Sequence, residues 1–250
     1  MSERSEGAAP AAPRPLRLAA MGDLHVTEAS EHRFRDVFAE ISEVADVLVL
    51  CGDLTNFGKT REAEILAEDL RACTIPSVGV LGNHDYECGQ PDEVAKILHS
   101  AGMTVLGEQA VIIHDVGFAG VKGFLGGFGR GELGAFGEPA IKSFVDAALE
   151  EARRLENALR SLKTERSVAV LHYAPVVDTV EGEPLEIYPF LGCSRLADAV
   201  DRFDHVAAVF HGHAHRGRHR GRTPRGIPVY NCAMMVTEAE LSKPYALIEV

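Results

Sequence analysis

The sequence contains no long apolar run. None of its apolar segments approaches the ~18 residues that a membrane-spanning helix needs, and no apolar core of a secretory signal is present. Residues 1–15, MSERSEGAAPAAPRP, carry alanine, proline, glycine and charge but, beyond Met1, no large apolar side chain. Such a segment buries too little surface to order itself. We therefore expect a flexible tail at 1–15, a folded domain at 16–250 and no membrane association.

Cysteine is also scarce, and no two cysteines form a CxxC pair. The five cysteines are Cys51, Cys73, Cys88, Cys193 and Cys232. Their odd number and wide spacing exclude a disulfide framework and a thiolate zinc site. The pattern favours a reduced, cytoplasmic protein whose cysteines are small buried side chains.

The chain has fewer basic than acidic residues. The chain has 25 Lys and Arg against 37 Asp and Glu, which gives a formal net charge of −12. An acidic surface argues against a dedicated binder of nucleic acid or of anionic membranes. It does not exclude an anionic substrate, because a bound metal ion can reverse the local field. Histidine, the commonest metal ligand among side chains, is abundant, with 11 copies.

The first part of the chain alternates apolar strands with amphipathic helices. The expected strands are 16–21, 47–51 and 75–81. The expected helices are 31–44, 60–73 and 91–101. This order indicates a βαβαβ unit with a mostly parallel sheet.

The pattern changes after this unit. Three short β-prone runs follow without helices between them, which favours a second, antiparallel or mixed sheet. These runs are 104–106, 110–114 and 117–121. The glycine-dense segment 117–137 is expected as a mobile loop, and the longest amphipathic helix is expected at 139–163.

Apolar runs beyond the long helix again indicate strands. They are expected at 168–171, 206–210, 227–230 and 245–250. Between them, 179–191 is expected as a loop and 194–203 as a short helix capped by Ser194. The sequence shows no internal repeat and no clear linker. We therefore expect one α/β domain in which two sheets are flanked by helices.

Five of the predicted strands end in side chains that can bind a metal ion. These side chains are Asp23 and His25, Asp53, Asn83, His172, and His213 with His215. A single histidine at a strand end is usually no more than a hydrogen-bonded polar residue. Because ligands of α/β sheets bind in the crevice at the carboxyl ends of the strands, five such ends indicate one shared metal site.

The donor set indicates which metals would bind. Seven ligands are too many for one tetrahedral zinc ion. Mixed oxygen and nitrogen donors favour borderline divalent ions such as Mn, Fe, Zn, Co or Ni over calcium. A carboxylate shared by two ions ~3.5–4 Å apart would hold a bridging water and lower its pKa toward neutrality. The set therefore fits two divalent ions, which could deprotonate water and bind an anionic phosphoryl group.

The ligands fall into five blocks, each with its own neighbours. The blocks are Asp23-x-His25, Gly52-Asp53, Gly82-Asn83-His84-Asp85, His172 and Gly212-His213-x-His215. In order and in glycine positions they resemble the calcineurin-like metallophosphoesterase superfamily over residues 23–215. The resemblance implies an α/β fold, a four-layer α/β/β/α sandwich with two central mixed β-sheets flanked by helices.

The resemblance also implies a role for each block. One ion would be held by Asp23, His25, Asp53 and His215, and the second by Asp53, Asn83, His172 and His213. A bridging hydroxide would attack phosphorus, and His84 would protonate the leaving group as general acid or contact the phosphoryl oxygen, with Asp85 orienting its ring. The implied reaction is hydrolysis of a phosphodiester or a phosphomonoester.

Substrate contacts are expected outside the blocks. The candidates are Arg216 and Arg218 at the start of an arginine run, Tyr173 beside His172, and Arg130 and Lys122 in or near the glycine-rich segment. Each has a structural alternative, a solvated turn for the arginines and core packing for Tyr173. The leaving group would be recognised by residues 117–137, 179–191 and 216–225. We expect a small phosphorylated substrate, with diesters slightly favoured.

Two other functions are compatible with the same fold. A protein-interaction scaffold with little catalysis would be expected to lose ligands, whereas the set here is intact. A nuclease of the same superfamily would be expected to carry an extended basic or aromatic surface, which the acidic chain lacks apart from its arginine run. Other histidine-rich hydrolases fit less well, because residues 211–215 lack the Asp-His ending of the metallo-β-lactamase motif and the first strand lacks the HxH of an amidohydrolase barrel.

Overall fold

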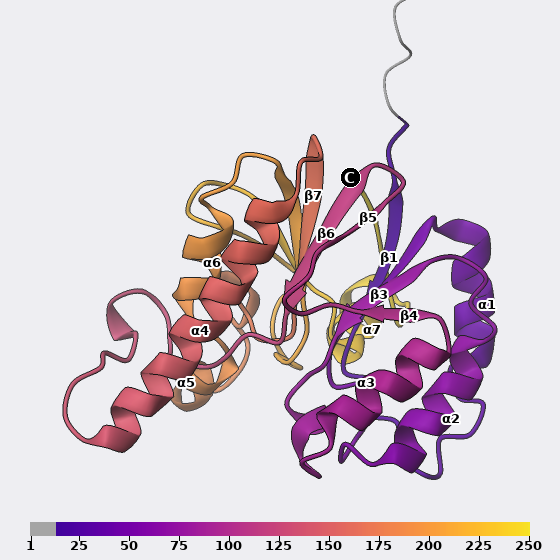
Figure 1. Ribbon diagram of the computed structural model, residues 1–250, viewed down its shortest axis with the longest axis horizontal. Helices are drawn as coiled ribbons and strands as arrows, with labels where there is room; N and C mark the ends of the chain where they lie inside the picture. The colour runs from indigo at the N-terminus through magenta and orange to yellow at the C-terminus, as the bar shows by residue number, and fades with distance from the viewer. Residues whose placement is uncertain (1–13) are drawn as a thin grey trace, which may run out of the picture.

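The computed structural model describes residues 14–250, so the tail predicted at 1–15 lies almost entirely outside the described residues. Two β-sheets pack face to face, and helices cover the outer face of each sheet (Figure 1). This arrangement confirms the predicted four-layer α/β/β/α sandwich with two mixed sheets. None of the helices within 14–250 combines the length and the apolar character that crossing a bilayer requires.

The first sheet has the strand order β11-β1-β2-β3-β4 and is parallel except for β11. Its strands are β1 Arg17–Met21, β2 Val47–Cys51, β3 Ser77–Val80, β4 Met103–Val105 and β11 Ala246–Glu249. Its outer face is covered by the helices α1 Arg35–Val44, α2 Thr60–Leu70 and α3 Pro91–Ser100. Strand β2 is apolar and buried throughout because it lies between this helical layer and the second sheet.

The second sheet has the strand order β5-β6-β7-β8-β10-β9, with antiparallel strands at its two edges. Its strands are β5 Val111–Ile113, β6 Val116–Val121, β7 Arg166–Leu171, β8 Val206–His211, β9 Arg220–Arg222 and β10 Pro228–Asn231. Helices α4 Pro139–Ser161 and α6 Ser194–Val200 cover its outer face. Two short helices, α5 Tyr188–Leu191 and α7 Met234–Leu241, lie in the connections.

The structure corrects the predicted boundary between the two sheets. The run expected at 104–106 in the second sheet forms β4, which pairs in parallel with β3 of the first sheet. The strand predicted at 117–121 is confirmed as part of β6, which is buried along its whole length, so the overlapping loop predicted at 117–137 begins only after residue 121. A short β-prone run carries no local signal for the sheet that it joins. Periodicity in the sequence therefore could not assign 104–106 to the first sheet.

Two further local predictions are wrong, and two elements were not predicted. Ser194 does not cap its helix; Cys193 occupies the cap position, and the Ser194 hydroxyl accepts the Gly129 N–H at 2.9 Å. The loop predicted at 179–191 contains α5. Helix α7 was not predicted because its apolar residues gather at its start rather than along one face. Strand β9 was likewise not predicted, because this three-residue edge strand, which pairs with β10, has no apolar pattern.

An apolar layer made of side chains from both sheets holds the sandwich together. Phe118 of β6 and Phe210 of β8 are fully buried in it, in one cluster with Val49 and Val80 of the first sheet. Burial of rings of this size is the dominant favourable term at such an interface. The layer fixes how the strand ends of one sheet lie relative to those of the other.

Replacing Phe118 with alanine should lower the free energy of unfolding by ~3–5 kcal/mol, because the lost ring leaves a cavity between the sheets. Urea denaturation followed by circular dichroism measures the change. Phe136→Ala is the matched control, since this ring is 92% exposed; its change should stay within about 0.5 kcal/mol. Equal destabilisation by the two variants would contradict the placement of Phe118.

Candidate metal centre

The seven predicted ligands lie together at the carboxyl ends of five strands. They are Asp23 and His25 after β1, Asp53 after β2, Asn83 after β3, His172 after β7, and His213 and His215 after β8. Donor atoms within 4.8 Å of one another form three overlapping groups, Asp23–His25–His215, His25–Asp53–His84 and Asp53–His172–His213. Strands from both sheets therefore contribute to one cluster of carboxylates and imidazoles.

Four of these residues have a left-handed backbone conformation. The φ angle is +58° at Asp23, +45° at His25, +49° at Asp53 and +70° at His213. Residues other than glycine adopt this region uncommonly, and such strain gathers at functional sites. The chain turns sharply at each of these positions as it leaves the sheet, and the turns bring the four side chains together.

Glycines stand beside the predicted ligands because predicted ligands that follow other strands lie against them. A Cβ atom on Gly82 would lie 2.1 Å from Oδ1 of Asp53, and one on Gly212 would lie 2.3 Å from Oδ2 of Asp23. Both distances are far shorter than van der Waals contact, so any side chain there would displace a carboxylate. The glycines of the Gly-Asn-His-Asp and Gly-His-x-His blocks are therefore packing requirements of the site.

Backbone carbonyls orient two of the imidazoles. Nδ1 of His172 lies 3.0 Å from the carbonyl oxygen of Cys51, and Nε2 of His213 lies 3.1 Å from that of Phe190. When these nitrogens donate to their carbonyls, the other nitrogen of each ring is unprotonated and can bind a cation. In His172 this nitrogen is Nε2, which lies 2.8 Å from Oδ1 of Asn83.

Two carboxylates are buried at the centre. Burial, reinforced by the charge of Asp23, raises the pKa of Asp53 to about 7. Burial also acts to raise the pKa of Asp23, but the hydrogen bond from His215 and the nearby imidazoles outweigh it and lower the pKa to about 2. Two carboxylates this close repel each other in a buried site, and a bound cation would relieve the repulsion.

The imidazoles are in the form that metals need. Burial lowers the pKa of His25 to about 4 and that of His213 to about 3, so both rings are neutral at neutral pH. Nε2 of His25 is buried and lacks a hydrogen-bond partner among residues 14–250. This nitrogen lies 3.9 Å from Oδ2 of Asp53, a separation that leaves room for a cation contacting both. The donors therefore fit divalent metal ions.

His84 lies beside the ligands and remains accessible, with 39% of its side chain exposed. Its Nδ1 lies 2.8 Å from the carbonyl oxygen of Asn56, and its Nε2 lies 3.9 Å from Oδ2 of Asp53. The ring packs edge-on against that of His25, with 4.5 Å between centroids. His84 thus faces both the cluster and solvent, where a substrate would arrive.

Asp85 bonds to backbone rather than to the His84 ring, so the prediction that it orients this ring is wrong. Its buried carboxylate accepts four hydrogen bonds of 2.6–3.2 Å, from the N–H groups of Gly82, Leu54 and Thr55 and from the Thr55 hydroxyl. These bonds tie the loop after β3 to the loop after β2. The carbonyl of Asn56 orients His84 instead.

The three arginines predicted to contact substrate are exposed. Arg218 forms an ion pair with Glu181 at 3.2 Å. Arg216 bonds through its backbone N–H to Glu183, and Arg130 lies in a short 3-10 helix, Gly129–Gly131. The hydrogen bonds and ion pairs within 14–250 join none of these three side chains to the predicted ligands.

Tyr173, by contrast, lies against the cluster. Its ring is buried, with 4.5 Å between its centroid and that of His213. The contributions of Thr55, Asn56 and Phe190 were missed. Asn56 and Phe190 act through carbonyl oxygens, and Thr55 binds a residue thirty positions away, so no side-chain pattern in the sequence marks them.

The fold and the donor set together define a metal-dependent hydrolase. A model of the calcineurin-like phosphoesterase family matches residues 16–217. The chain therefore belongs to the calcineurin-like phosphoesterase family and is a metal-dependent phosphoric ester hydrolase. A comparison with curated proteins finds no match.

Solved structures share the fold at low sequence identity. The phosphopantetheinyl hydrolase PptH from Mycobacterium tuberculosis is 14% identical, with a TM-score of 0.67 over 95% of this chain and 97% of that one. The protein TT1561 of Thermus thermophilus is 14% identical, with a TM-score of 0.54 over 95% and 99%. The purple acid phosphatase PPD1 from yellow lupin is 14% identical, with a TM-score of 0.53 over 97% of this chain and 48% of that one. At this identity the likeness shows the fold.

Gly82→Ala should reduce the metal content of the purified protein, because the new methyl group would displace the carboxylate of Asp53. Elemental analysis after loading with Mn measures it. Gly134→Ala is the matched control, since a Cβ atom there meets nothing within 4 Å. An unchanged metal content in Gly82→Ala would show that the close approach has no bearing on the site.

Proposed function

We propose that the chain is a binuclear metal-dependent phosphoesterase that hydrolyses a small phosphodiester or phosphomonoester. The observation that carries the proposal is the position of Asp53. Its Oδ1 lies 3.3 Å from Nε2 of His172, whereas its Oδ2 lies 3.9 Å from Nε2 of His25. A carboxylate that presents one oxygen to each of two donor groups is suited to bridge two ions.

The residues divide into two sites around this carboxylate. One is formed by Asp23, His25, Asp53 and His215, the other by Asp53, Asn83, His172 and His213. Mixed oxygen and nitrogen donors favour Mn, Fe, Zn, Co or Ni. Two such ions would supply an activated water and neutralise the charge of the phosphoryl group. The amide oxygen of Asn83 is neutral, which limits negative charge where a phosphate must arrive.

His84 would supply the proton that the leaving group needs. With Nδ1 held by the carbonyl of Asn56, Nε2 is the ring atom that faces the centre. A protonated Nε2 can donate to the leaving oxygen as the ester bond breaks. Asp85 supports this geometry indirectly, because it fixes the loop that carries Asn83 and His84.

Ion pairs within the arginine run 216–225 favour a small substrate over nucleic acid. Arg218 is paired with Glu181, and Arg225 with Asp204 at 2.6 Å. Cations that are already paired with carboxylates contribute less to the neutralisation of a polyanion, on which nucleic-acid affinity depends. The net charge of −12 also disfavours nucleic-acid binding.

Replacing His84 with alanine should slow turnover while metal content stays unchanged. The loss should reach ~10²–10⁴-fold for an alkyl leaving group, which needs a proton, and should be smaller for 4-nitrophenolate, which does not. Steady-state kinetics on a matched alkyl and 4-nitrophenyl phosphoester, with elemental analysis, measure both. His99→Ala, an exposed histidine on α3, is the control. An equal loss for both leaving groups would rule out His84 as the acid.

Replacing Asp53 with asparagine should remove both metals, because this carboxylate is shared between the two donor groups. His215→Ala should weaken only the first site, and about one ion per chain should remain after dialysis. Elemental analysis of the native protein and of the two variants tests this. A single ion in the native protein at saturation would refute the binuclear proposal.

A further inference from the structure

Lys122 directly follows β6 and lies beside the metal centre. Its carbonyl oxygen accepts the N–H groups of His172 and Tyr173 at 3.0 and 3.1 Å. The residue is thus fixed to the strand end that carries a proposed ligand. Burial lowers the pKa of the Lys122 ammonium, and the charges of Glu151 and Asp53, the second of which lies in the centre itself, act in the opposite direction.

The Lys122 ammonium has an unusual environment for a lysine. Nζ lies 5.0 Å from the ring centroid of Phe124, 5.2 Å from that of Tyr173 and 5.3 Å from that of Tyr86. A cation so enclosed normally has a carboxylate partner. Here Nζ donates a hydrogen bond to the carbonyl of Gly123 at 3.0 Å, and the ion pairs of residues 14–250 include none for Lys122.

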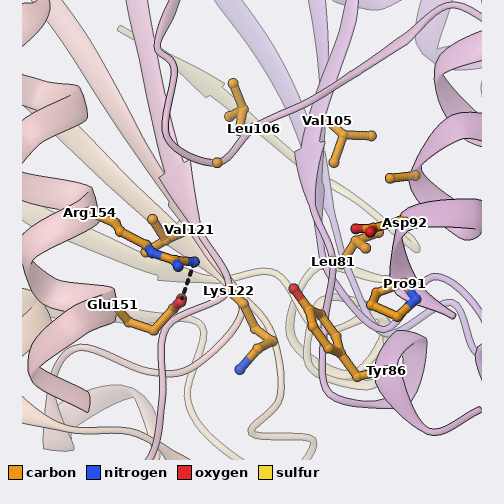
Figure 2. Close-up of a pocket in the computed structure, with 12 residues that line it drawn as sticks. Leu81, Tyr86, Pro91, Asp92, Val105, Leu106, Val121, Lys122, Glu151 and Arg154 are labelled. Atoms are coloured by element: carbon orange, nitrogen blue, oxygen red, sulfur yellow. Dashed lines mark ion pairs between the residues drawn. The ribbon is translucent and has the colours of Figure 1, made fainter. Parts of the chain in front are cut away.

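The neighbouring acid is already engaged. Glu151 of α4 accepts the N–H of Gly123 at 2.8 Å and pairs with Arg154 at 3.5 Å, the pair drawn as a dashed line in Figure 2. Its two oxygens are therefore committed to a backbone N–H and to a guanidinium. The Lys122 ammonium is left with aromatic faces and one carbonyl, and it can accept an anion without breaking an existing ion pair.

A cavity of about 170 Å³ opens beside Lys122. Lys122 and Tyr86 stand at one end of it, with Glu151 and Arg154 on one wall and Pro91 on the other (Figure 2). Its volume exceeds that of several water molecules, each of which occupies ~30 Å³ in the liquid. The cavity therefore has room for part of a substrate next to the ammonium.

Tyr173 connects this cation to the metal centre. Its ring contacts that of His213 on one side, with 4.5 Å between centroids, and Lys122 Nζ lies 5.2 Å from its centroid. Lys122 is therefore one buried aromatic ring away from a proposed ligand, and a leaving group that extends from the metal centre into the cavity would meet its ammonium.

We propose that Lys122 binds a second anionic group of the substrate, a phosphate or a carboxylate carried by the leaving group. This inference rests on the proposed function, because the first phosphoryl group is held at the metal centre. Lys122 is then a specificity-determining residue, which favours substrates with two separated negative groups over substrates with one. A purely structural lysine, which only packs its charge on aromatic rings, would make no such selection.

Calorimetric titration of the metal-loaded protein tests the proposal with three probes. All proteins in the titration carry His84→Ala, including the one called native here, so that hydrolysis of the phosphoester probes is slowed. Methyl phosphate carries one anionic group, phosphoglycolate adds a carboxylate, and ethylene glycol bisphosphate adds a second phosphate. Native protein should bind at least one of the two-group probes more tightly than methyl phosphate. Lys122→Met should lower that affinity about tenfold or more, as loss of a charge-assisted hydrogen bond does. Its affinity for methyl phosphate should stay within about twofold of native.

Two further variants complete the design. Lys122→Arg keeps the charge and should retain the preference for two-group probes. Lys96→Met makes the same substitution at an exposed residue of α3 and should change nothing. Thermal melting of all variants reports whether packing is altered. The probe that loses more affinity in Lys122→Met identifies the second group as a phosphate or as a carboxylate.

Two results would overturn the inference. One is an equal loss of affinity for all three probes in Lys122→Met, which is what a packing role predicts. The other is native protein that binds methyl phosphate as tightly as the two-group probes; in that case the proposed function survives and only the role of Lys122 fails. If metal-loaded native protein binds none of the probes, the proposed function fails and the inference fails with it.

Discussion

The buried carboxylate of Asp53 is the group on which the site depends. One of its oxygens accepts the His84 N–H at 2.9 Å and lies 3.3 Å from Nε2 of His172, and the other lies 3.9 Å from Nε2 of His25. Through these contacts it reaches the loops after β1, β3 and β7. Burial that raises its pKa to about 7 also means that its ionised form needs cations nearby. Asp53 therefore connects the loops and also favours metal binding, because its ionised form needs cations nearby.

Bringing such groups together carries a conformational cost. Asp23, His25, Asp53 and His213 all have positive φ angles, a strain of ~1–3 kcal/mol each. Strain of this size persists only where the surroundings determine it, and here the surroundings are strands that are buried on both faces. The apolar layer between the sheets, centred on residues such as Phe118, thus offsets the strain at the strand ends. The apolar layer that stabilises the fold and the strand ends that carry the candidate ligands are therefore adjacent but separate.

Whether the sequence could predict a contact depends on how far apart in the chain its partners lie. Asp53 was predictable because an apolar run, a glycine and a donor are contiguous in the chain. The role of Asp85 was not, because its partners include backbone N–H groups about thirty residues away, and backbone groups leave no mark on sequence. The sheet that 104–106 joins depends likewise on pairing with β3, which is a tertiary event. Local patterns indicated the candidate ligands, whereas the supporting contacts required the fold.

The division of the donors between the sheets has a thermodynamic consequence. Asp23, His25, Asp53 and Asn83 follow strands of the first sheet, and His172, His213 and His215 follow strands of the second. A metal ion bound across this boundary binds only when the two sheets are packed, so its binding free energy adds to the stability of the interface. An ion at a hundred times its dissociation constant would add about 2.7 kcal/mol. Lys122 directly follows β6 of the second sheet, so metal binding would also hold the proposed anion subsite in position beside the centre.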